Sequence, residues 1–448
     1  MMQIPHDLAV KTFPFSELPI STKTKELYES LRAKKILGKL EQRKFSNDIP
    51  FFYVYACERP SGKNKVNVSH GFGGSEDEAE AISFAIFEAI EHYCILHERR
   101  DLFIKGSFNK LKDKAINPIR YEAFSKKQLS IKKNKDLIIS SEKRYNWLQG
   151  YSLTKKREVL IPASLAYASY NSKEYSEPTI RKPISTGAAC GPTTSFAIAR
   201  GLCEIIERDS YMISFLPEMP KKLVVIRKKD GDVFNFINRF KKYGLELYFI
   251  DTTLDTGVFS VVSILVDRTG CGPAVCAGLG SSLEPERSIE TSAIEALRSY
   301  ATSRELYFQE KNIKPPKKNS FDWFSWKRHL IWSSPHMIKE VEKVIASARK
   351  VSLPKPKLFK TDHEKVLYLT KKISKLGCEV IYVDMTIPEI EKYGLKVIKV
   401  SCPEMVPLWH DERYPYLGAK RLREVPKKYG VNVNLNLDEN ELISLYPF

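Results

Sequence analysis

The chain has few cysteines and no long hydrophobic run, and both absences narrow its class. Its eight cysteines are irregularly spaced over 448 residues, a density too low for a disulfide framework. No apolar segment reaches the roughly 18–20 residues that a membrane-spanning helix needs. The N-terminus lacks the charged start and the apolar stretch of a signal peptide. We therefore expect a reduced, cytoplasmic protein without membrane contact.

The common nucleotide and metal motifs are also absent. The sequence has no GxxxxGK[S/T] phosphate loop, no HExxH zinc motif and no GxGxxG fingerprint between a strand and a helix. Cys190 lies in a Gly/Ala-rich segment, but no neighbouring base that would activate its thiol can be identified, so we interpret it as structural. Any nucleotide or metal site must therefore use a different pattern.

Positive charge is in excess. The chain has 72 Lys and Arg against 54 Asp and Glu, a formal net charge of +18. A polyanionic partner such as nucleic acid would account for this excess. However, the lysines are scattered along the chain rather than gathered into one stripe with aromatics, which favours a generally basic surface. We therefore do not expect nucleic-acid binding.

The order of segments indicates the fold class. Strand-like and helix-like segments alternate along the chain, which predicts an α/β or mixed α+β fold. Among them are a helix that opens at a Ser/Thr cap, Ser21, and a strand at 66–68. Lysine-rich residues 106–145 and polar residues 311–357 are expected to be excursions from the core, and residues 366–400 to form a βαβ-like unit. The length suits two or three subdomains or one large α/β unit.

The most informative feature is a motif that occurs three times. Long helices are predicted at about 76–97, 195–215 and 285–308, each after a segment of glycine and other small residues that we expect to be a loop. Each helix carries a Glu among apolar residues, followed three residues later by a second charged side chain. These pairs are Glu88 and Glu91, Glu204 and Glu207, and Glu295 and Arg298.

The i, i+3 spacing places the paired carboxylates on one face of their helix. Carboxylates among apolar residues are costly to bury without a cation, so a single Glu of this kind would be interpreted as half of a salt bridge. Two pairs and a third Glu favour one convergent acidic site instead. Such oxygen ligands suit Mg²⁺ with substrate phosphates, and Arg208 and Arg298 beside them suit the phosphates of ATP.

The three motifs can be compared with those of known families. They comprise Gly71-Phe72-Gly73 with Glu88–Tyr93, Ser185–Gly191 with Glu204–Asp209, and Gly278 with Glu295-Ala296. They resemble GKG…EAIERY, S.GLAAG…E.IERD and G.G…EA.QSR of the YcaO family, ATP-dependent enzymes that activate peptide backbone amides. Gly418–Arg421 is similar to that family's closing LGxRR segment.

The resemblance covers about residues 66–425 and implies a YcaO-type catalytic domain there. Residues 1–65 would be an extension available for partner contact, and residues 426–448 a C-terminal tail. The resemblance further implies that carboxylates of the first two helices bind Mg²⁺ and ATP phosphates and that two arginines support the nucleotide. These residues are Glu88, Glu91, Glu204, Glu207, Arg208 and Arg298.

The implied activity is azoline formation, giving thiazoles or oxazoles, from Cys, Ser or Thr of a ribosomally synthesised precursor peptide. Thioamide and amidine formation are alternatives within the family. In each, a nucleophile adds to a backbone carbonyl, ATP phosphorylates the oxyanion, and phosphate leaves. The implied partners are the precursor peptide and an E1-like or related protein that presents its leader, in a homodimer or hetero-oligomer.

The chain departs from the family pattern at several positions. Phe72, Phe84 and Phe196 stand where the family has Lys, Ser and an acidic residue, respectively. His92, Arg298 and Tyr300 stand where it has Arg, Gln and Arg. A second interpretation therefore stays open, in which the chain is a degenerate family member that no longer turns over ATP and acts as a scaffold subunit.

Overall fold

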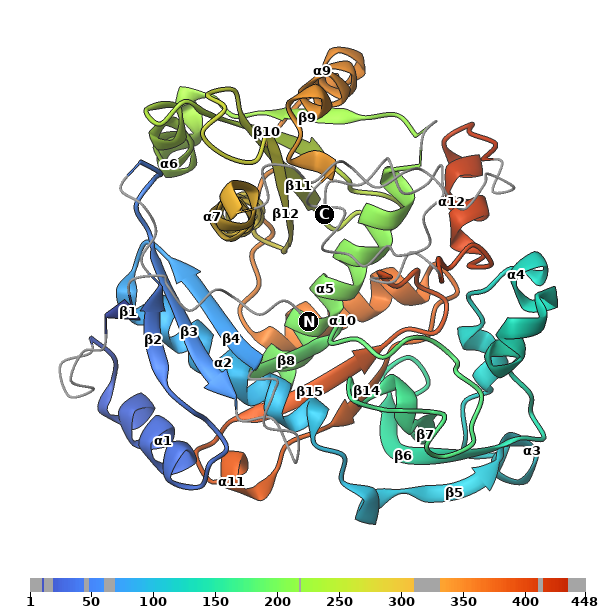
Figure 1. The fold of residues 1–448 in the computed structure, drawn as a ribbon. Coiled ribbons are helices and arrows are strands. Elements are labelled where there is room, and N and C mark those ends of the chain that lie inside the picture. The colour runs from blue at the N-terminus through green and yellow to red at the C-terminus, as the bar shows by residue number, and fades with distance from the viewer. Residues whose placement is uncertain are drawn as a thin grey trace.

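The computed structural model describes residues 10–11, 19–43, 48–59, 69–216, 219–309, 331–409 and 414–433. They form three β-sheets around the middle of the molecule, where helix α5 runs (Figure 1). Neighbouring strands are antiparallel except for one pair, so the mixed α+β fold expected from the sequence is confirmed.

The first sheet is antiparallel with strand order β1-β2-β3-β4. Helix α1 begins after Ser21, whose hydroxyl accepts the N–H of Thr24, as the predicted cap requires. The predicted strand at 66–68 lies outside the described residues. The elements are β1 (Val10–Lys11), α1 (Thr22–Ala33), β2 (Leu40–Arg43), β3 (Tyr53–Arg59), β4 (Ser69–Ser75) and α2 (Glu78–Leu96).

The second sheet has strand order β12-β11-β10-β9-β13. Strand β13 pairs in parallel with β9, so residues 349–352 form an end strand of this sheet rather than an excursion, and the prediction for 311–357 is wrong there. The elements are β9 (Lys222–Val225), α6 (Gly231–Lys241), β10 (Leu245–Asp251), β11 (Ser260–Asp267), β12 (Val275–Ser281), α7 (Pro285–Gln309), α9 (Ile338–Ser347) and β13 (Arg349–Ser352).

The third sheet has strand order β5-β6-β14-β15-β8, with β7 also paired to β6. Because β14 and β15 are antiparallel, the βαβ-like unit predicted at 366–400 is wrong. The strands are β5 (Ile104–Ser107), β6 (Arg144–Ser152), β7 (Arg157–Pro162), β8 (Ala188–Gly191), β14 (Ile381–Asp384) and β15 (Lys396–Ser401); the helices are α3 (Phe108–Leu111), α4 (Lys126–Ser130), α5 (Thr194–Ser214), α10 (Asp362–Ser374), α11 (Pro388–Glu391) and α12 (Arg421–Lys428).

The glycine-rich segments before the three long helices are strands rather than loops. They form β4, β8 and β12, each at one end of its sheet, so the expectation of loops was wrong for these residues. A Cβ at Gly73 would collide with the carbonyl oxygen of Ala81 in α2, and one at Gly278 with that of Ser292 in α7. The glycines let an edge strand lie directly against its helix, which a side chain would prevent.

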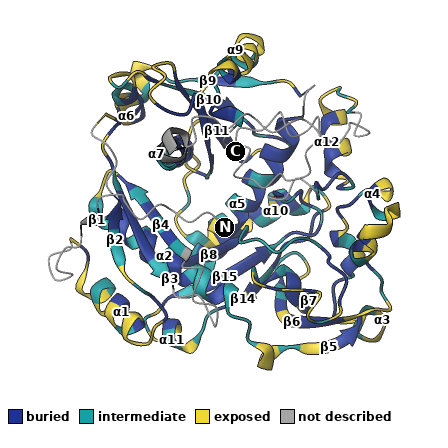
Figure 2. Ribbon diagram, viewed as in Figure 1, coloured by how far each residue is buried: buried dark blue, intermediate teal, exposed yellow. Residues whose placement is uncertain are grey.

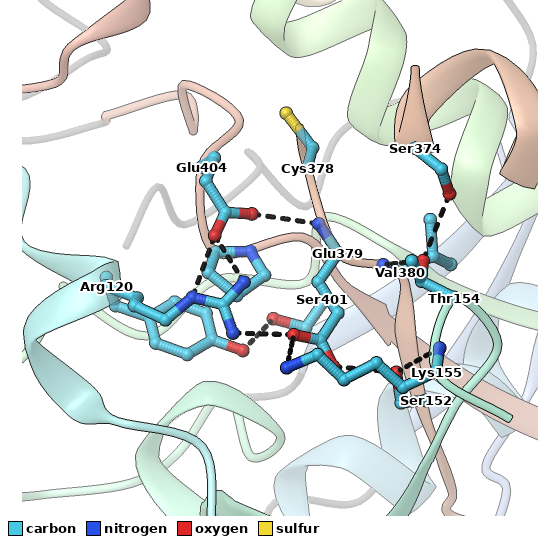
Figure 3. A network of polar contacts seen from close by, with 12 residues as sticks. Arg120, Ser152, Thr154, Lys155, Ser374, Cys378, Glu379, Val380, Ser401 and Glu404 are labelled. Carbon is cyan, nitrogen blue, oxygen red and sulfur yellow. Dashed lines mark hydrogen bonds and ion pairs between the residues drawn. The ribbon is translucent and has the colours of Figure 1, made fainter. Parts of the chain in front are cut away.

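Residues 106–145 are joined firmly to the core. Tyr121 is fully buried, so part of this segment packs against the core, while many of its other residues are exposed. In Figure 3 the guanidinium of Arg120 lies between Glu404 and Glu379, with Nε–Oε1 and Nη1–Oε2 distances of 2.9 and 2.6 Å. Glu379 also accepts the hydroxyl of Ser152 at 2.7 Å. This network ties the segment to β6 and to the loop after β15.

Burial follows the sheets. The strands and the helix faces that cover them are buried, whereas α4, α6 and α9 present exposed residues (Figure 2). The core cluster around α2 includes residues of the third sheet. The cluster around α7 includes Val54 of β3 in the first sheet and Phe52 just before it. The three sheets are therefore packed together through their long helices. None of the helices that the structure describes is both long and apolar enough to span a membrane.

Candidate active site

One glutamate on each long helix is held by the segment that precedes the helix: by a residue of β4, by a residue of β12, or by the residue just before β8. The backbone N–H groups of Phe72, Gly187 and Leu279 donate to Oε2 of Glu88, Glu204 and Glu295, at 2.8, 3.0 and 2.7 Å. Gly187 has φ +86°, a backbone conformation that favours glycine. The threefold motif in the sequence thus corresponds to a threefold repeat of the same strand-to-helix contact.

The other carboxylate oxygen of each of these glutamates faces a basic side chain of its own helix. Oε1 of Glu88, Glu204 and Glu295 lies 3.9, 3.7 and 3.8 Å from a nitrogen of His92, Arg208 and Arg298, respectively. Arg298 thus pairs with Glu295, the glutamate that precedes it by three residues in α7.

These side chains line one cavity of ≈790 Å³ between the three helices. All six residues that the sequence singled out contribute to its wall: Glu88, Glu91, Glu204, Glu207, Arg208 and Arg298. The structure therefore brings together residues that are up to 210 positions apart along the chain. Which of them bind a ligand stays a prediction.

The second glutamate of each pair lies in a setting that disfavours its charge. Burial, together with the neighbouring charges of Glu204 and Glu88, raises the pKa of Glu91 to about 8. Burial also raises the pKa of Glu207 to about 8, although Arg208, whose Nε lies 3.4 Å from its Oε1, opposes the shift. The cavity therefore favours a cation that would compensate these carboxylates.

The carboxylates of this cavity suit Mg²⁺ only when another ligand supplies its remaining coordination positions. Among the residues that the structure describes, no group of three or more His, Cys, Asp and Glu side chains could hold a metal ion. Mg²⁺ usually binds through one or two carboxylates and fills its other positions with waters and substrate phosphates. The carboxylates along this cavity therefore suit an ion that arrives with a phosphate-bearing ligand.

Most positions that depart from the family pattern lie in the same cavity wall, including Phe72, Phe84 and Phe196. The guanidinium of Arg298 lies 5.7 Å from the ring centroid of Phe72, and that of Arg287 lies 5.5 Å from that of Phe84. These are cation–π distances. Helix α7 thus brings positive charge to two positions where phenylalanine replaces a polar residue.

Tyr300, another departure, has a structural role. Its ring is buried and its hydroxyl donates to Asp267 of β11 at 2.7 Å. Cys190 lines the cavity, but its burial raises the pKa of its thiol well above the usual value, as expected for a structural cysteine.

Sequence reasoning missed Lys399. This residue of β15 is 4% exposed, and its Nζ donates to the carbonyl oxygens of Ile184, Ser185 and Thr186 at 2.8, 2.9 and 2.7 Å. Burial lowers its pKa to about 8, against the opposite influence of Glu204 and Glu91. Lys399 holds the segment whose next residue, Gly187, contacts Glu204. The only signal in the sequence was one lysine between apolar strand residues.

The closing segment of the family pattern supports the second motif. Arg421 forms a bidentate contact with Asp209, at 2.9 Å from Nε and 2.7 Å from Nη2, and also contacts Asp255 at 2.7 Å. Asp209 follows Arg208 in α5 and also accepts the N–H of Val406 at 2.8 Å. This buried network fixes the turn of α5 that carries Arg208.

We expect the free energy of unfolding of the metal-free protein to fall as the pH rises from about 4.5 to 8. Glu91 and Glu207 release their protons near pH 8 in the folded chain but near 4.5 without burial. Between these values the folded state binds more protons than the unfolded state, so stability declines with rising pH, by up to about 1.4 kcal/mol per pH unit and proton. Denaturant unfolding across this range measures the slope.

Two variants check the origin of this slope. Glu91→Gln should flatten it and stabilise the metal-free protein at alkaline pH, because the amide carries no charge. Glu340→Gln, on the exposed surface of α9, is the matched control and should leave the slope unchanged. An equal slope in wild type and Glu91→Gln would contradict the assignment.

The chain has relatives among known sequences. Residues 70–406 match the model of the YcaO cyclodehydratase family, which is described as ATP- and Mg²⁺-binding. An uncharacterized protein from Methanothermobacter thermautotrophicus is 26% identical over 363 residues, covering 78% of this chain and 85% of that protein. An uncharacterized protein in the tfuA 3' region of Rhizobium leguminosarum bv. trifolii is 27% identical over 167 residues, covering 35% of this chain and 39% of that protein.

Solved structures share the fold. A heterocyclase in complex with substrate and cofactor has a TM-score of 0.73 at 18% identity; the match covers 92% of this chain but 56% of the heterocyclase chain. YcaO from Methanopyrus kandleri, bound with AMPPCP and Mg²⁺, has a TM-score of 0.61 at 16% identity and coverages of 90% and 95%. A chain of the E. coli microcin synthetase McbBCD complex with pro-MccB17 bound has a TM-score of 0.55 at 12% identity and coverages of 82% and 87%.

Proposed function

Since the chain belongs to the YcaO family, we propose that it uses ATP and Mg²⁺ to activate a backbone amide of a ribosomally synthesised precursor peptide. The finer reaction that we propose is azoline-forming cyclodehydration. The likeness in fold to a heterocyclase agrees with this choice, and thioamide and amidine formation are the alternatives within the family. A product that has lost one water from the peptide would agree with it, whereas exchange of the amide oxygen for sulfur or nitrogen would contradict it.

The observation that carries the proposal is the threefold anchoring of carboxylates around one cavity. Each of Glu88, Glu204 and Glu295 accepts a backbone N–H from the segment before its helix, which restrains the carboxylate at the cavity wall. Such preorganised charge is what phosphoryl transfer needs, because catalysis of that step depends mainly on positioning and electrostatics.

The chain's own residues would divide this work between anions and cations. Bound Mg-ATP would supply the phosphoryl group and a metal charge that stabilises its transfer. The carboxylates of Glu88, Glu91, Glu204 and Glu207 would orient that ligand. Arg208 and Arg298, from opposite walls of the cavity, would offset the negative charge that develops on the transferred group.

The proposed partners follow the same reasoning. We propose that the peptide reaches the cavity with the help of an E1-like or related protein that presents its leader, within a homodimer or hetero-oligomer. The McbBCD complex, whose structure holds pro-MccB17, supports an assembly of this kind.

A non-catalytic scaffold is the second candidate, because three phenylalanines replace polar residues in the cavity wall. Two observations weigh against it. The rings of Phe72, Phe84 and Phe196 leave a cavity of ≈790 Å³, and arginines of α7 lie over two of them. The apolar side chains therefore reshape the wall without filling the space.

Calorimetric titration with Mg-ATP separates the two candidates. We expect a Kd on the order of micromolar, because the carboxylates and arginines of the cavity match both parts of the ligand. Titration of ATP with excess chelator is the control and should show much weaker binding, since the carboxylates then repel the phosphates. A chain that shows no heat with Mg-ATP would support the scaffold and contradict the proposal.

A further inference from the structure

A second, smaller cavity of ≈70 Å³ lies beside the first, and the charged residues that line it differ from those of the first. Arg208 lines both cavities, and in the segment before β8 Ile184 and Thr186 line the small cavity whereas Ser185 lines the large one. The large cavity is lined by many carboxylates, whereas the wall of the small one contains no Asp or Glu. Its charged residues are all basic: Arg181, Lys182, Arg208 and Lys399.

Three of these cations are held by uncharged groups. Lys399 donates to backbone carbonyls, as described above, and Arg181 donates from Nε to the carbonyl of Tyr121 at 2.9 Å and from Nη2 to that of Pro403 at 2.7 Å. Lys182 Nζ lies 4.4 Å from the ring centroid of Tyr414. Within the part of the chain that the structure describes, no carboxylate lies within ion-pair distance of Arg181, Lys182 or Lys399; Glu204 and Glu91 favour the charge of Lys399, and Glu404 that of Arg181, only from a greater distance. An anion inside the cavity would pair with these groups directly.

One hydroxyl group in the wall of the small cavity has no hydrogen-bond partner among the described residues. The side chain of Ser164 is 3% exposed, and its Oγ has no hydrogen-bond partner among the described residues. Buried hydroxyls without a partner are rare, because they lose their bonds to water without replacement. A ligand with several acceptor oxygens would satisfy Ser164 and neutralise the cations together.

The wall is also rigid. Ser401 Oγ donates to Tyr121 Oη at 3.1 Å, and the next turn carries Glu404, which Arg120 holds (Figure 3). Arg181 bridges the same two segments through its two carbonyl contacts. The basic groups are thus fixed before any ligand arrives, which lowers the entropic cost of binding one.

We propose that this cavity binds a phosphate-sized tetrahedral oxyanion, at a site separate from the carboxylate-lined cavity. One water needs about 10–15 Å³ of such volume, so the space takes several waters or one oxyanion of this size. The site is a property of the chain alone and does not depend on the proposed function. If that function holds, the shared residue Arg208 places the site next to the point at which phosphate is released.

The test is a calorimetric titration of the full chain with inorganic phosphate, in chloride buffer without metal, nucleotide or peptide. We expect saturable binding of one phosphate, with sulfate as a competitor. Lys182→Met and Ser164→Ala should each weaken the affinity about tenfold, because each removes a direct contact to the anion. Lys182 is partly exposed and Ser164 is small, so both variants should stay folded, which circular dichroism would check.

Two controls locate the bound phosphate. Lys365→Met removes a basic residue from the wall of the large cavity only, and Glu290→Gln removes a carboxylate there that lies outside the threefold motif; neither should change the phosphate affinity. Absence of saturable binding, or sensitivity to Lys365→Met instead of Lys182→Met, would overturn the proposal. Since wild-type phosphate binding is measured without nucleotide or peptide, failure here leaves the ATP-dependent function standing, and the reverse also holds.

Discussion

Replacing Glu204 and Glu207 together with glutamine should abolish peptide-stimulated phosphate release, lowering it about a thousandfold or more. The amides keep the volume of both side chains but remove two negative charges from the wall of the large cavity. Oε2 of Glu204 would still have a neutral counterpart for the N–H of Gly187, so the local fold should persist. The measurement is the rate of phosphate release with ATP, Mg²⁺ and peptide.

The control for this variant is Glu290→Gln, which changes a carboxylate of α7 in the same wall that lies outside the threefold motif. It should lower the rate far less than the double substitution. Phosphate release that survives in Glu204→Gln/Glu207→Gln would show that these residues have been given the wrong role. A folded double variant, checked by thermal unfolding, keeps the comparison meaningful.

Arg298→Ala should weaken the binding of Mg-ATP by roughly 1.5–3 kcal/mol, or about 10- to 150-fold, the range for a hydrogen bond to a charged group. Its guanidinium lies between Glu295 and the ring of Phe72, at the cavity wall. A bound phosphate would replace Glu295 as its main partner. Calorimetry with Mg-ATP measures the change, and Arg298→Lys should keep part of the affinity, because it keeps the charge without the planar fork.

Arg304→Ala is the matched control for Arg298. Arg304 lies on the same helix but pairs with Asp48 at 2.6 Å, and it does not contribute to the wall of the large cavity. Its loss should leave ATP affinity unchanged. Equal affinity in wild type and Arg298→Ala would mean that the ion pair with Glu295 is only structural.

These two predictions bear on whether the departures from the family pattern disable the site. Phenylalanine at position 72 removes a cation that the family motif supplies, and Arg298 lies over that ring from a different helix. A large effect of Arg298→Ala would indicate that the positive charge has moved from one wall of the cavity to another. A chain that binds Mg-ATP but shows no phosphate release would instead favour the scaffold interpretation.

Much of the fold was predictable because its signals are local. The long helices follow from apolar periodicity, α1 from its cap at Ser21, and most strands from short β-rich runs. The glycine-rich segments were misjudged, because glycine usually marks a turn. In β4 and β12 glycine serves a contact with a helix backbone that only the packed structure contains. The parallel partner of β13 is more than a hundred residues away, which no local pattern indicates.

The candidate site likewise has features that the sequence predicts and features that depend on the tertiary structure. The sequence by itself determined which helices carry charged pairs and that those pairs share one helix face, since the i, i+3 spacing and the helical period suffice for that. Only the tertiary structure decided that the three faces meet at one cavity, that backbone N–H groups of the preceding segments hold Glu88, Glu204 and Glu295, and that Lys399 supports the segment before β8. The physical reason is range: helix geometry repeats over a few residues, whereas hydrogen bonds between distant segments depend on how the sheets pack.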